Sequence, residues 1–287
     1  MRSVRLEPIS NLIDTLHLGN GRVIAAWETD GLIVDPGPES CIETLLAGLE
    51  QEPRALLLTH IHLDHAGASG ALVERFPDLR VYVHEVGAPH MIDPSRLMAS
   101  ATRLYGDEMD RLWGEMIPIP SERVVALRGG ETVEGFKVLA TPGHASHHVS
   151  YLDLDEGTAY VGDVGGARIP PSEVVLLPTP PPDIDLEAWQ RSLDQIAEHN
   201  PQRLRLTHFG EVSDAAAHID LVRERMQVAA DLSRPLDRDA FVAAIEQEIS
   251  SGGDAETASR YRQATPPEQL WLGLERYWRQ RAESAEG

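Results

Sequence analysis

The sequence is poor in cysteine, in basic residues and in long apolar runs, and each shortage excludes a class of protein. The single cysteine, Cys41, cannot form an intrachain disulfide, which favours a reducing cytoplasm. The 287 residues include 25 basic and 46 acidic ones, and the resulting net charge of −21 repels phosphate backbones, so we expect no nucleic-acid partner. No run of about 18 apolar residues occurs, so we expect no membrane span.

The ends of the chain differ in character. The N-terminal residues Met1–Glu7 are charged, and no apolar stretch follows them, so no secretory signal is predicted. From about Asp214 onward the pattern is helical only, with segments at 241–249 and 267–281 and with Gly252 and Gly253 between them. We therefore predict a main domain over 1–213 and a C-terminal helical extension over 214–287.

Residues 1–213 alternate between β-like runs and helical periodicity. Short runs of β-branched and aliphatic residues predict strands at 22–28, 31–35, 55–59, 81–84, 123–127, 136–140, 150–154, 158–161 and 203–206. Helical spacing predicts a helix after Asp35-Pro-Gly37, another ending near Phe76, and a third over 186–196 with Asp185 as its N-cap. Two β-rich halves that each close with a helix suit a pair of facing sheets with helices outside.

Two local features accompany this pattern. Ser40 and Glu43 have the spacing of a capping box at the start of the first helix, where Cys41 is interpreted as a small packing residue. Residues 90–120 form an insertion rich in methionine and other apolar residues, which we predict to be a helical pair packed on the core. Because methionine-rich surfaces adapt to varied apolar ligands, this insertion is also a candidate lid over a substrate pocket.

Seven histidine and aspartate residues stand directly after predicted strands. Four of them fall within six residues, and the other three follow three later strands: His60, His62, Asp64, His65, His144, Asp163 and His208. Imidazole and carboxylate are ligand types that zinc accepts. Their repeated position at carboxyl ends of strands predicts one shared metal site. The other histidines that we weighed are interpreted as surface or hydrogen-bonded residues: His84, His90, His147, His148, His199 and His218.

These motifs resemble a known family. Thr59-His-Ile-His-Leu-Asp-His-Ala-Gly67 is similar to the HxHxDH signature of the metallo-β-lactamase superfamily. Thr141-Pro-Gly-His144, Gly162-Asp163 and Thr207-His208 resemble its later ligand motifs, in the same order, so that the resemblance covers roughly residues 10–210. It implies an α/β (α+β) fold, the αββα sandwich, as the catalytic domain over 1–213, with the helices of 214–287 as an appendage.

The resemblance also implies which residues bind each metal ion. His60, His62 and His144 would hold one metal ion, and a second would be held by Asp64, His65 and His208. Asp163 would bridge the two ions, and Asp35 would support the ligands from behind. The cofactor is expected to be two Zn²⁺ ions, with iron or manganese as alternatives. Such a pair would cleave an ester, thioester or lactone through a metal-bridging hydroxide, with Asp64 assisting protonation of the leaving group.

The sequence departs from the motif of one family subgroup, and this departure narrows the expected substrate class. Members that cleave glutathione thioesters carry Cys-Gly-Arg soon after the bridging aspartate, whereas this chain has Asp163-Val-Gly-Gly-Ala-Arg168. Glutathione recognition is therefore not expected, and within the glyoxalase II/lactonase-like branch the small-molecule substrate is expected to be an ester, a thioester or a lactone. The candidate substrate contacts are Arg168, His148, Met98 and Trp113. Two other functions fit the same motifs: a persulfide dioxygenase with one iron on two histidines and an aspartate, and a non-catalytic member that binds a small molecule or partner.

The last helical segment offers a further expectation. Trp271, Leu274 and Trp278 share one helix face through their i, i+3 and i+7 spacing. They are interpreted as residues of the core or of a subunit contact rather than as a cofactor site. An exposed apolar patch there would favour a homodimer.

Overall fold

A computed structural model describes residues 10–286, so the prediction on Met1–Glu7 lies outside the described residues. The chain divides into two compact units. The first comprises residues 1–19 and 24–126, and the second comprises residues 20–23 and 127–287. A six-stranded sheet belongs to each unit, and the two units are described separately.

The sheet of the first unit keeps its strands in sequence order. They are β1 (Asn11–Asp14), β2 (Ala25–Thr29), β3 (Leu32–Val34), β4 (Ala55–Leu57), β5 (Arg80–His84) and β6 (Val124–Leu127). Strands β1 to β3 pair antiparallel, whereas β3, β4 and β5 pair in parallel. The parallel strands β3 and β4 consist of buried aliphatic residues, as expected for strands covered on both faces. Their carboxyl ends meet at one edge, where Asp35 and His60 follow.

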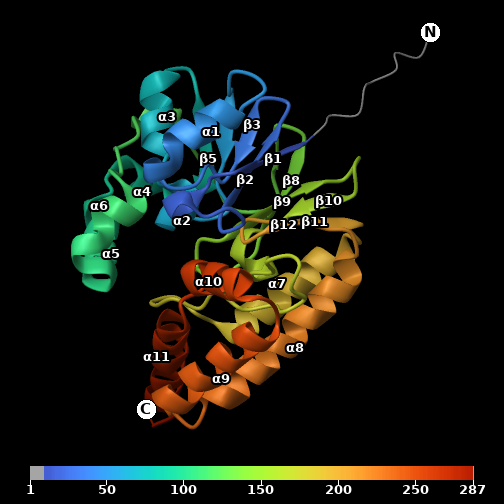
Figure 1. Cartoon of the computed structure of the whole chain (residues 1–287). Helices are drawn as coiled ribbons and strands as arrows, with labels where there is room; N and C mark the ends of the chain where they lie inside the picture. Colours follow the sequence, from blue (N-terminus) through green and yellow to red (C-terminus); the bar gives the residue numbers. More distant parts are fainter. Residues whose placement is uncertain (1–9, 287) are drawn as a thin grey trace. The chain divides into compact units, whose positions relative to one another are not determined.

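Short helices lie beside this sheet (Figure 1). They are η1 (His17–Gly19), η2 (Glu39–Cys41), α1 (Ile42–Gly48), α2 (Leu63–Ala66), α3 (Ser69–Arg75), α4 (Ala88–Ile92), α5 (Ser95–Tyr105), η3 (Gly106–Glu108), α6 (Met109–Trp113) and η4 (Ser121–Arg123). Helices α4 to α6 lie side by side and supply the helical character predicted for 90–120. Trp113 is buried, with its ring stacked 5.3 Å from that of His17. The role of the segment as a lid stays a prediction.

The predicted capping box at Ser40 and Glu43 is wrong. Helix α1 begins at Ile42, its N-cap is Cys41, and no side chain caps it. Ser40 Oγ instead donates a hydrogen bond to Leu112 O at 2.7 Å, and Ser40 lies within the preceding turn η2. Cys41 is buried, which agrees with its interpretation as a packing residue, and burial raises the pKa of its thiol.

The sheet of the second unit has the order β12-β11-β10-β9-β8-β7. Its strands are β7 (Thr132–Val133), β8 (Phe136–Ala140), β9 (Val149–Asp153), β10 (Thr158–Tyr160), β11 (Arg203–Leu206) and β12 (Gly210–Val212), and the turn η5 (Gly162–Gly165) follows β10. Strand β9 is antiparallel to both β8 and β10, and β10 is parallel to β11. Strands β8, β10 and β11 therefore run in one direction and end at the same edge.

Long helices complete the second unit: α7 (Leu186–Glu198), α8 (Ala215–Ser233), α9 (Arg238–Ser251), α10 (Ala255–Ala264) and α11 (Pro267–Glu286). Asp185 caps α7, as predicted, by accepting a hydrogen bond from Ala188 N. The helical region predicted after residue 214 is formed by α8 to α11 (Figure 1). Trp271 and Leu274 are buried in the same hydrophobic core as strands β10 and β11, whereas Trp278 packs against that core partly buried.

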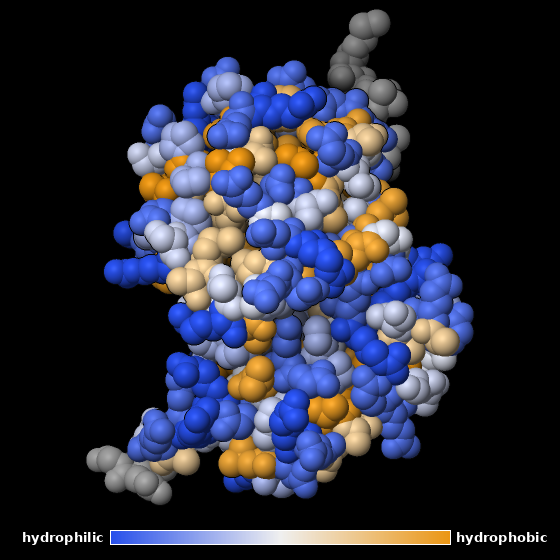
Figure 2. Space-filling model, turned by 60° about the vertical axis from the view of Figure 1, so that its left-hand side comes forward, coloured by the Kyte–Doolittle hydropathy of each residue, from blue (hydrophilic) through white to orange (hydrophobic). Residues whose placement is uncertain are grey.

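Among residues 10–286, no helix combines the length and apolar character that crossing a membrane requires. The face in Figure 2 is mostly hydrophilic, with apolar side chains in small, separate patches. The exposed apolar residues of the C-terminal helical region include Leu236 and Leu272. A homodimer stays a prediction.

Candidate metal centre

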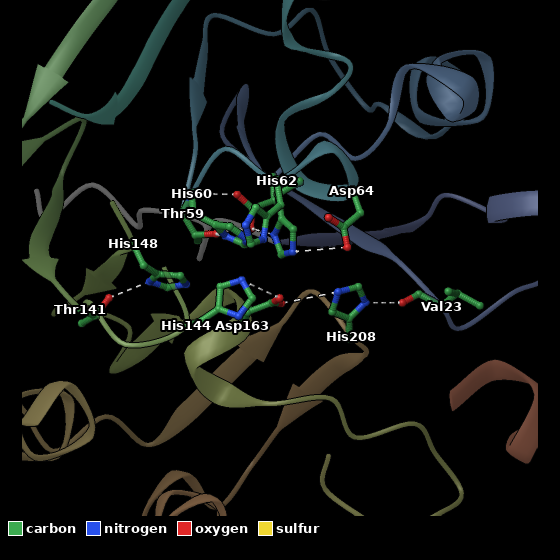
Figure 3. A network of polar contacts seen from close by, with 12 residues as sticks. Val23, Thr59, His60, His62, Asp64, Thr141, His144, His148, Asp163 and His208 are labelled. Carbon is green, nitrogen blue, oxygen red and sulfur yellow. Dashed lines mark hydrogen bonds and ion pairs between the residues drawn. The ribbon is translucent and has the colours of Figure 1, made fainter. Parts of the chain in front are cut away.

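The first unit carries four predicted ligands, His60, His62, Asp64 and His65, which we call the first ligand set. They occupy the loop after β4 and the single turn of α2, which begins directly after His62. His60 and His65 are fully buried, with ring centroids 4.0 Å apart. His60 Nε2 and His62 Nδ1 are 3.0 Å apart (Figure 3). Two nitrogens at this separation can both contact one zinc ion at about 2.0–2.1 Å from each.

Asp35 holds the first ligand set from behind. This buried residue follows β3 and accepts hydrogen bonds from Thr59 N at 2.8 Å and from Thr59 Oγ1 at 2.7 Å. It also accepts one from His65 Nδ1 at 2.8 Å. His65 Nε2 is then the nitrogen nearer the ligand set, 3.9 Å from Asp64 Oδ2. Metal-binding histidines commonly donate their second N–H to a carboxylate, so Asp35 has the contacts expected of a supporting aspartate.

Thr59 determines which nitrogen of His60 is available as a ligand. Its hydroxyl proton goes to Asp35 Oδ2, so its oxygen accepts from His60 Nδ1–H at 3.1 Å. This tautomer leaves the lone pair of His60 Nε2 for a metal ion. The sequence analysis included Thr59 in the motif but did not predict this role. The sequence indicates it only through the hydroxyl residue that directly precedes the first histidine.

The second unit holds His144, Asp163 and His208, which we call the second ligand set, at the carboxyl ends of β8, β10 and β11. All three are buried. Asp163 Oδ2 lies 3.3 Å from His144 Nε2, and Asp163 Oδ1 lies 3.5 Å from His208 Nε2. Figure 3 shows the carboxylate between the two rings. One carboxylate oxygen of Asp163 thus lies near the Nε2 atom of each histidine.

Backbone carbonyl groups orient both histidines of the second ligand set. His144 Nδ1–H donates to Pro178 O at 2.7 Å, and His208 Nδ1–H donates to Val23 O at 2.8 Å (Figure 3). In the neutral imidazole each donation leaves the lone pair on Nε2, which is the nitrogen near Asp163. Sequence reasoning missed both contacts, because a backbone acceptor has no residue-type signal.

Helix α7 supports the loop that carries His144. Gly143 has φ 146°, and a Cβ there would lie 2.4 Å from Trp189 Cα, so only glycine fits. The Trp189 ring meets the His144 ring edge-on at 5.9 Å, and its Nε1 donates to Val164 O at 2.9 Å. Asp185 N donates to Gly143 O at 2.9 Å. The N-terminal half of α7 thus fixes the loops that bear His144 and Asp163.

His218 on α8 contacts the same region. It is buried, and its Nε2 donates to Gly165 O at 2.8 Å, which confirms its interpretation as a hydrogen-bonded histidine. Burial lowers the pKa of its imidazole, and the positive charge of Arg168 lowers it further. The ring is therefore neutral near pH 7 and supports the turn η5 without adding charge.

The four predicted substrate contacts lie in different surroundings. Arg168 is partly exposed and paired with Glu173, and its N donates to His208 O at 2.6 Å. His148 is fully buried, with Nδ1 2.9 Å from Thr141 Oγ1 (Figure 3). Met98 is half-buried on α5, and Trp113 is buried at the end of α6. Their contact with a substrate stays a prediction.

The chemistry of both ligand sets suits a divalent transition metal. Each offers imidazole nitrogen and carboxylate oxygen, and neither includes a thiolate, which is a donor set that zinc accepts and that also serves iron. The histidines are largely buried, and four of them have the second ring nitrogen on a protein acceptor. Such second contacts are typical of metal ligands. The residues present therefore fit a metal cofactor.

Comparisons with known proteins agree with this chemistry. The model of the metallo-beta-lactamase superfamily matches residues 23–208. The metallo-beta-lactamase fold-containing protein ST1585 of Sulfurisphaera tokodaii is 29% identical over 188 residues, which cover 62% of this chain and 70% of that protein. A hydroxyacylglutathione hydrolase of Synechococcus is 33% identical over 135 residues, 46% of this chain and 42% of that enzyme. The chain thus matches less than half the length of that hydrolase.

Among solved structures, ST1585 from Sulfolobus tokodaii is similar with a TM-score of 0.63 and 24% identity, over 77% of this chain and 85% of that chain. This likeness shows the fold, and it confirms the fold class that the motifs implied, with a helical region at the C-terminus. The family match extends over more than half of the chain and includes all seven predicted ligands. The chain belongs to the metallo-beta-lactamase superfamily.

Proposed function

We propose that the chain is a metal-dependent hydrolase of ester-type bonds, with two ions held jointly by the two ligand sets. The proposed grouping follows from the resemblance of the motifs to those of the superfamily: His60, His62 and His144 for one ion, Asp64, His65 and His208 for the other, and Asp163 as the shared ligand. The carboxylate of Asp163 carries the proposal, because it offers one oxygen to each of two histidines from different strands. Membership of a largely hydrolytic superfamily supports it.

The chain's own residues have distinct tasks in such a reaction. Bound zinc ions would polarise the substrate carbonyl and lower the pKa of a water molecule to about 7. His144, His208, His60 and His65 present oriented Nε2 atoms because their Nδ1 atoms are held. Asp64 is the more exposed partner of the Asp64–His65 pair, at 21% against 0%. Its carboxylate is therefore the side chain of this pair that a substrate can reach, and we assign it the assistance of leaving-group protonation.

Among ester-type substrates we favour a thioester. Several relatives bear the name hydroxyacylglutathione hydrolase, at 32–33% identity over less than half of their length. The chain lacks the Cys-Gly-Arg stretch expected after the bridging aspartate and has Val164-Gly-Gly-Ala-Arg168 instead. We therefore expect thioester hydrolysis that does not depend on a glutathione moiety.

Metal content combined with a substrate panel tests this proposal. Purified protein should contain close to two zinc ions per chain and should cleave thioesters, esters or lactones in a chelator-sensitive way. One iron per chain, with oxygen uptake on glutathione persulfide, would replace the hydrolase with a persulfide dioxygenase. Metal-free protein that binds a small molecule without turnover would make the chain a non-catalytic member.

Asp64→Asn tests the proton-holding role. Asparagine keeps the shape and one oxygen but cannot deliver a proton, so kcat should fall by about 10²–10⁴-fold while KM changes little. Steady-state kinetics must accompany a metal analysis of each preparation. Asp194→Asn, at an exposed carboxylate on α7, is the matched control and should retain full activity. If Asp64→Asn has wild-type kcat at full metal occupancy, Asp64 does not move the proton.

A further inference from the structure

The irregular segment 166–185 contacts both His144 of the second ligand set and the C-terminal helices α10 and α11. Between the end of η5 at Gly165 and the start of α7 at Leu186, the described backbone has one isolated β-bridge, between Ala167 and Leu176. Pro178 lies in this segment, and its carbonyl oxygen accepts the hydrogen bond of His144 Nδ1 at 2.7 Å. Because no helix or strand contains Pro178, its carbonyl position depends on tertiary contacts.

Helix α11 supplies contacts directly beside Pro178. Thr179 Oγ1 donates a buried hydrogen bond to Leu270 O at 2.9 Å. One turn along the helix, a Cβ on Gly273 would lie 2.0 Å from Thr179 O and 3.0 Å from Pro180 C. Only a residue without a side chain lets the two backbones approach this closely. At the far end of the segment, Arg276 Nε donates to Pro182 O at 3.1 Å.

The earlier half of the segment has separate anchors. Tyr261 on α10 accepts a hydrogen bond from Ile169 N at 2.9 Å and donates one to Val174 O. A Cβ on Gly252 would lie 2.4 Å from Val174 Cγ2. These anchors hold residues 169–174, whereas the α11 contacts hold residues 179–182. Pro178 therefore lies between two anchors, the Ala167–Leu176 bridge before it and the α11 contacts after it, and α11 holds the residue directly next to it.

We infer that α11 is a functional part of the metal centre, with Thr179 and Gly273 acting as positioning residues for His144. The inference rests on the proposed metal site. Leu270 and Gly273 of α11 contact Thr179, which directly follows Pro178. Pro178 O accepts the hydrogen bond of His144 Nδ1. On the other side of the ring, His144 Nε2 lies 3.3 Å from Asp163 Oδ2. A shift of the Pro178 carbonyl would change both the tautomer and the direction of the His144 ring.

Three substitutions isolate these contacts in the full chain. Thr179→Val keeps the side-chain shape and removes the hydroxyl donor, and Thr179→Ser restores the donor. Gly273→Ala inserts a methyl group against the 179–180 backbone. Ser233→Ala is the matched control, because it removes the hydrogen bond from Trp278 Nε1 of α11 at 2.9 Å without touching the segment. Melting temperatures of all variants distinguish a local change at the proposed metal site from a global loss of stability.

Two readouts test the inference without using substrate. Long-range ¹H–¹⁵N correlation spectra of the metal-free protein report the tautomer of His144, which should be Nδ1–H in the wild type and mixed in Thr179→Val and Gly273→Ala. Affinity for Co²⁺, measured by competition with a chelator, should fall by about 10–100-fold in these two variants, as for other contacts behind a ligand. Thr179→Ser and Ser233→Ala should bind Co²⁺ like the wild type.

The outcomes separate this inference from the proposed function. Folded Thr179→Val and Gly273→Ala proteins with the wild-type tautomer and Co²⁺ affinity would overturn the inference and leave the hydrolase untouched. If the variants differ as expected but the wild type cleaves nothing in the substrate panel, the proposed function fails and the inference stands. If the wild type binds no metal, the proposed site fails, and an unchanged His144 tautomer in the variants would reject the positioning role as well.

Discussion

At the scale of single residues, four of the proposed histidine ligands differ in the group that accepts the hydrogen bond of their Nδ1 atom. A hydroxyl holds His60, a carboxylate holds His65, and carbonyl groups hold His144 and His208. A carboxylate acceptor raises the basicity of an imidazole ligand and fixes its ring. His65, with Asp35 behind it, should therefore be the most electron-rich of these ligands, and the two carbonyl-held histidines should depend more on backbone position.

His218 gives a prediction at the same scale. Burial lowers the pKa of its imidazole in the folded chain, and Arg168 and Glu173 are the charged groups that act on it. The unfolded chain therefore takes up the proton first, so the contribution of neutral His218 to stability is complete above about pH 6.5 and is lost as pH falls below that value. The loss amounts to at most about 1.4 kcal/mol per pH unit.

Replacing His218 with glutamine should remove this dependence, because the amide can donate to Gly165 O and does not titrate. Urea unfolding of metal-free protein between pH 8 and pH 5 gives the free energy of unfolding for both chains. We expect the wild type to lose stability more steeply below about pH 6.5. Parallel curves would mean that His218 is protonated in the folded chain.

At the scale of elements, the sequence was most informative where the chain is buried. Strands β2 to β5 and β8 to β11 lie where apolar runs predicted them, because buried strands need such runs. The partly exposed edge strand β6 was also predicted from its apolar run. Strands β1, β7 and β12 were not predicted. All three are edge strands of two to four residues. They are too short and too polar to show the alternation of apolar and polar residues that predicts a strand.

The candidate site was predictable in part for a related reason. The seven ligand-type residues follow strand ends in motifs that chemistry makes conspicuous. The contacts that orient them reach far along the chain, as between His208 and Val23 O, and involve backbone atoms. The failed capping box has the same origin, since Ser40 bonds Leu112 O, 72 residues away. Contacts of this kind follow only from the folded topology.

Helix α7 gives a prediction at the element scale. Asp185→Ala removes the N-cap bond to Ala188 N and should cost about 1 kcal/mol of unfolding free energy. Asp237→Ala removes the equivalent cap of α9, from Ala240 N, at a similar cost. Since the start of α7 also bonds Gly143 O and packs on His144, only Asp185→Ala should weaken Co²⁺ binding. Equal affinities in the two variants would show that capping of α7 does not affect the ligands.

At the scale of the whole molecule, the proposed ligands are divided between the two compact units. The first ligand set lies entirely in one compact unit and the second entirely in the other. The single cysteine leaves no intrachain disulfide to link them. If the two sets hold the ions jointly, as proposed, metal binding must couple the stability of one unit to that of the other.

Calorimetry with and without zinc tests this coupling. At a free zinc concentration of 100 times the dissociation constant, binding adds about 2.7 kcal/mol to the free energy of unfolding. For a chain of 287 residues the gain from one ion should raise the melting temperature by roughly 4–5 °C, and the gain from two ions by roughly twice as much. Joint ligation requires both units to gain stability together, so any separate transitions of the metal-free protein should merge when zinc is added.

The matched variant for this experiment is Asp163→Asn, which alters the carboxylate proposed to contact both ions. Its melting curve should respond less to zinc than that of the wild type, while its metal-free curve stays close to the wild-type one. Stabilisation of one unit alone would mean that a single ligand set binds metal by itself. In that case the binuclear arrangement would be wrong, and a mononuclear site, as in the dioxygenase alternative, would become the better description.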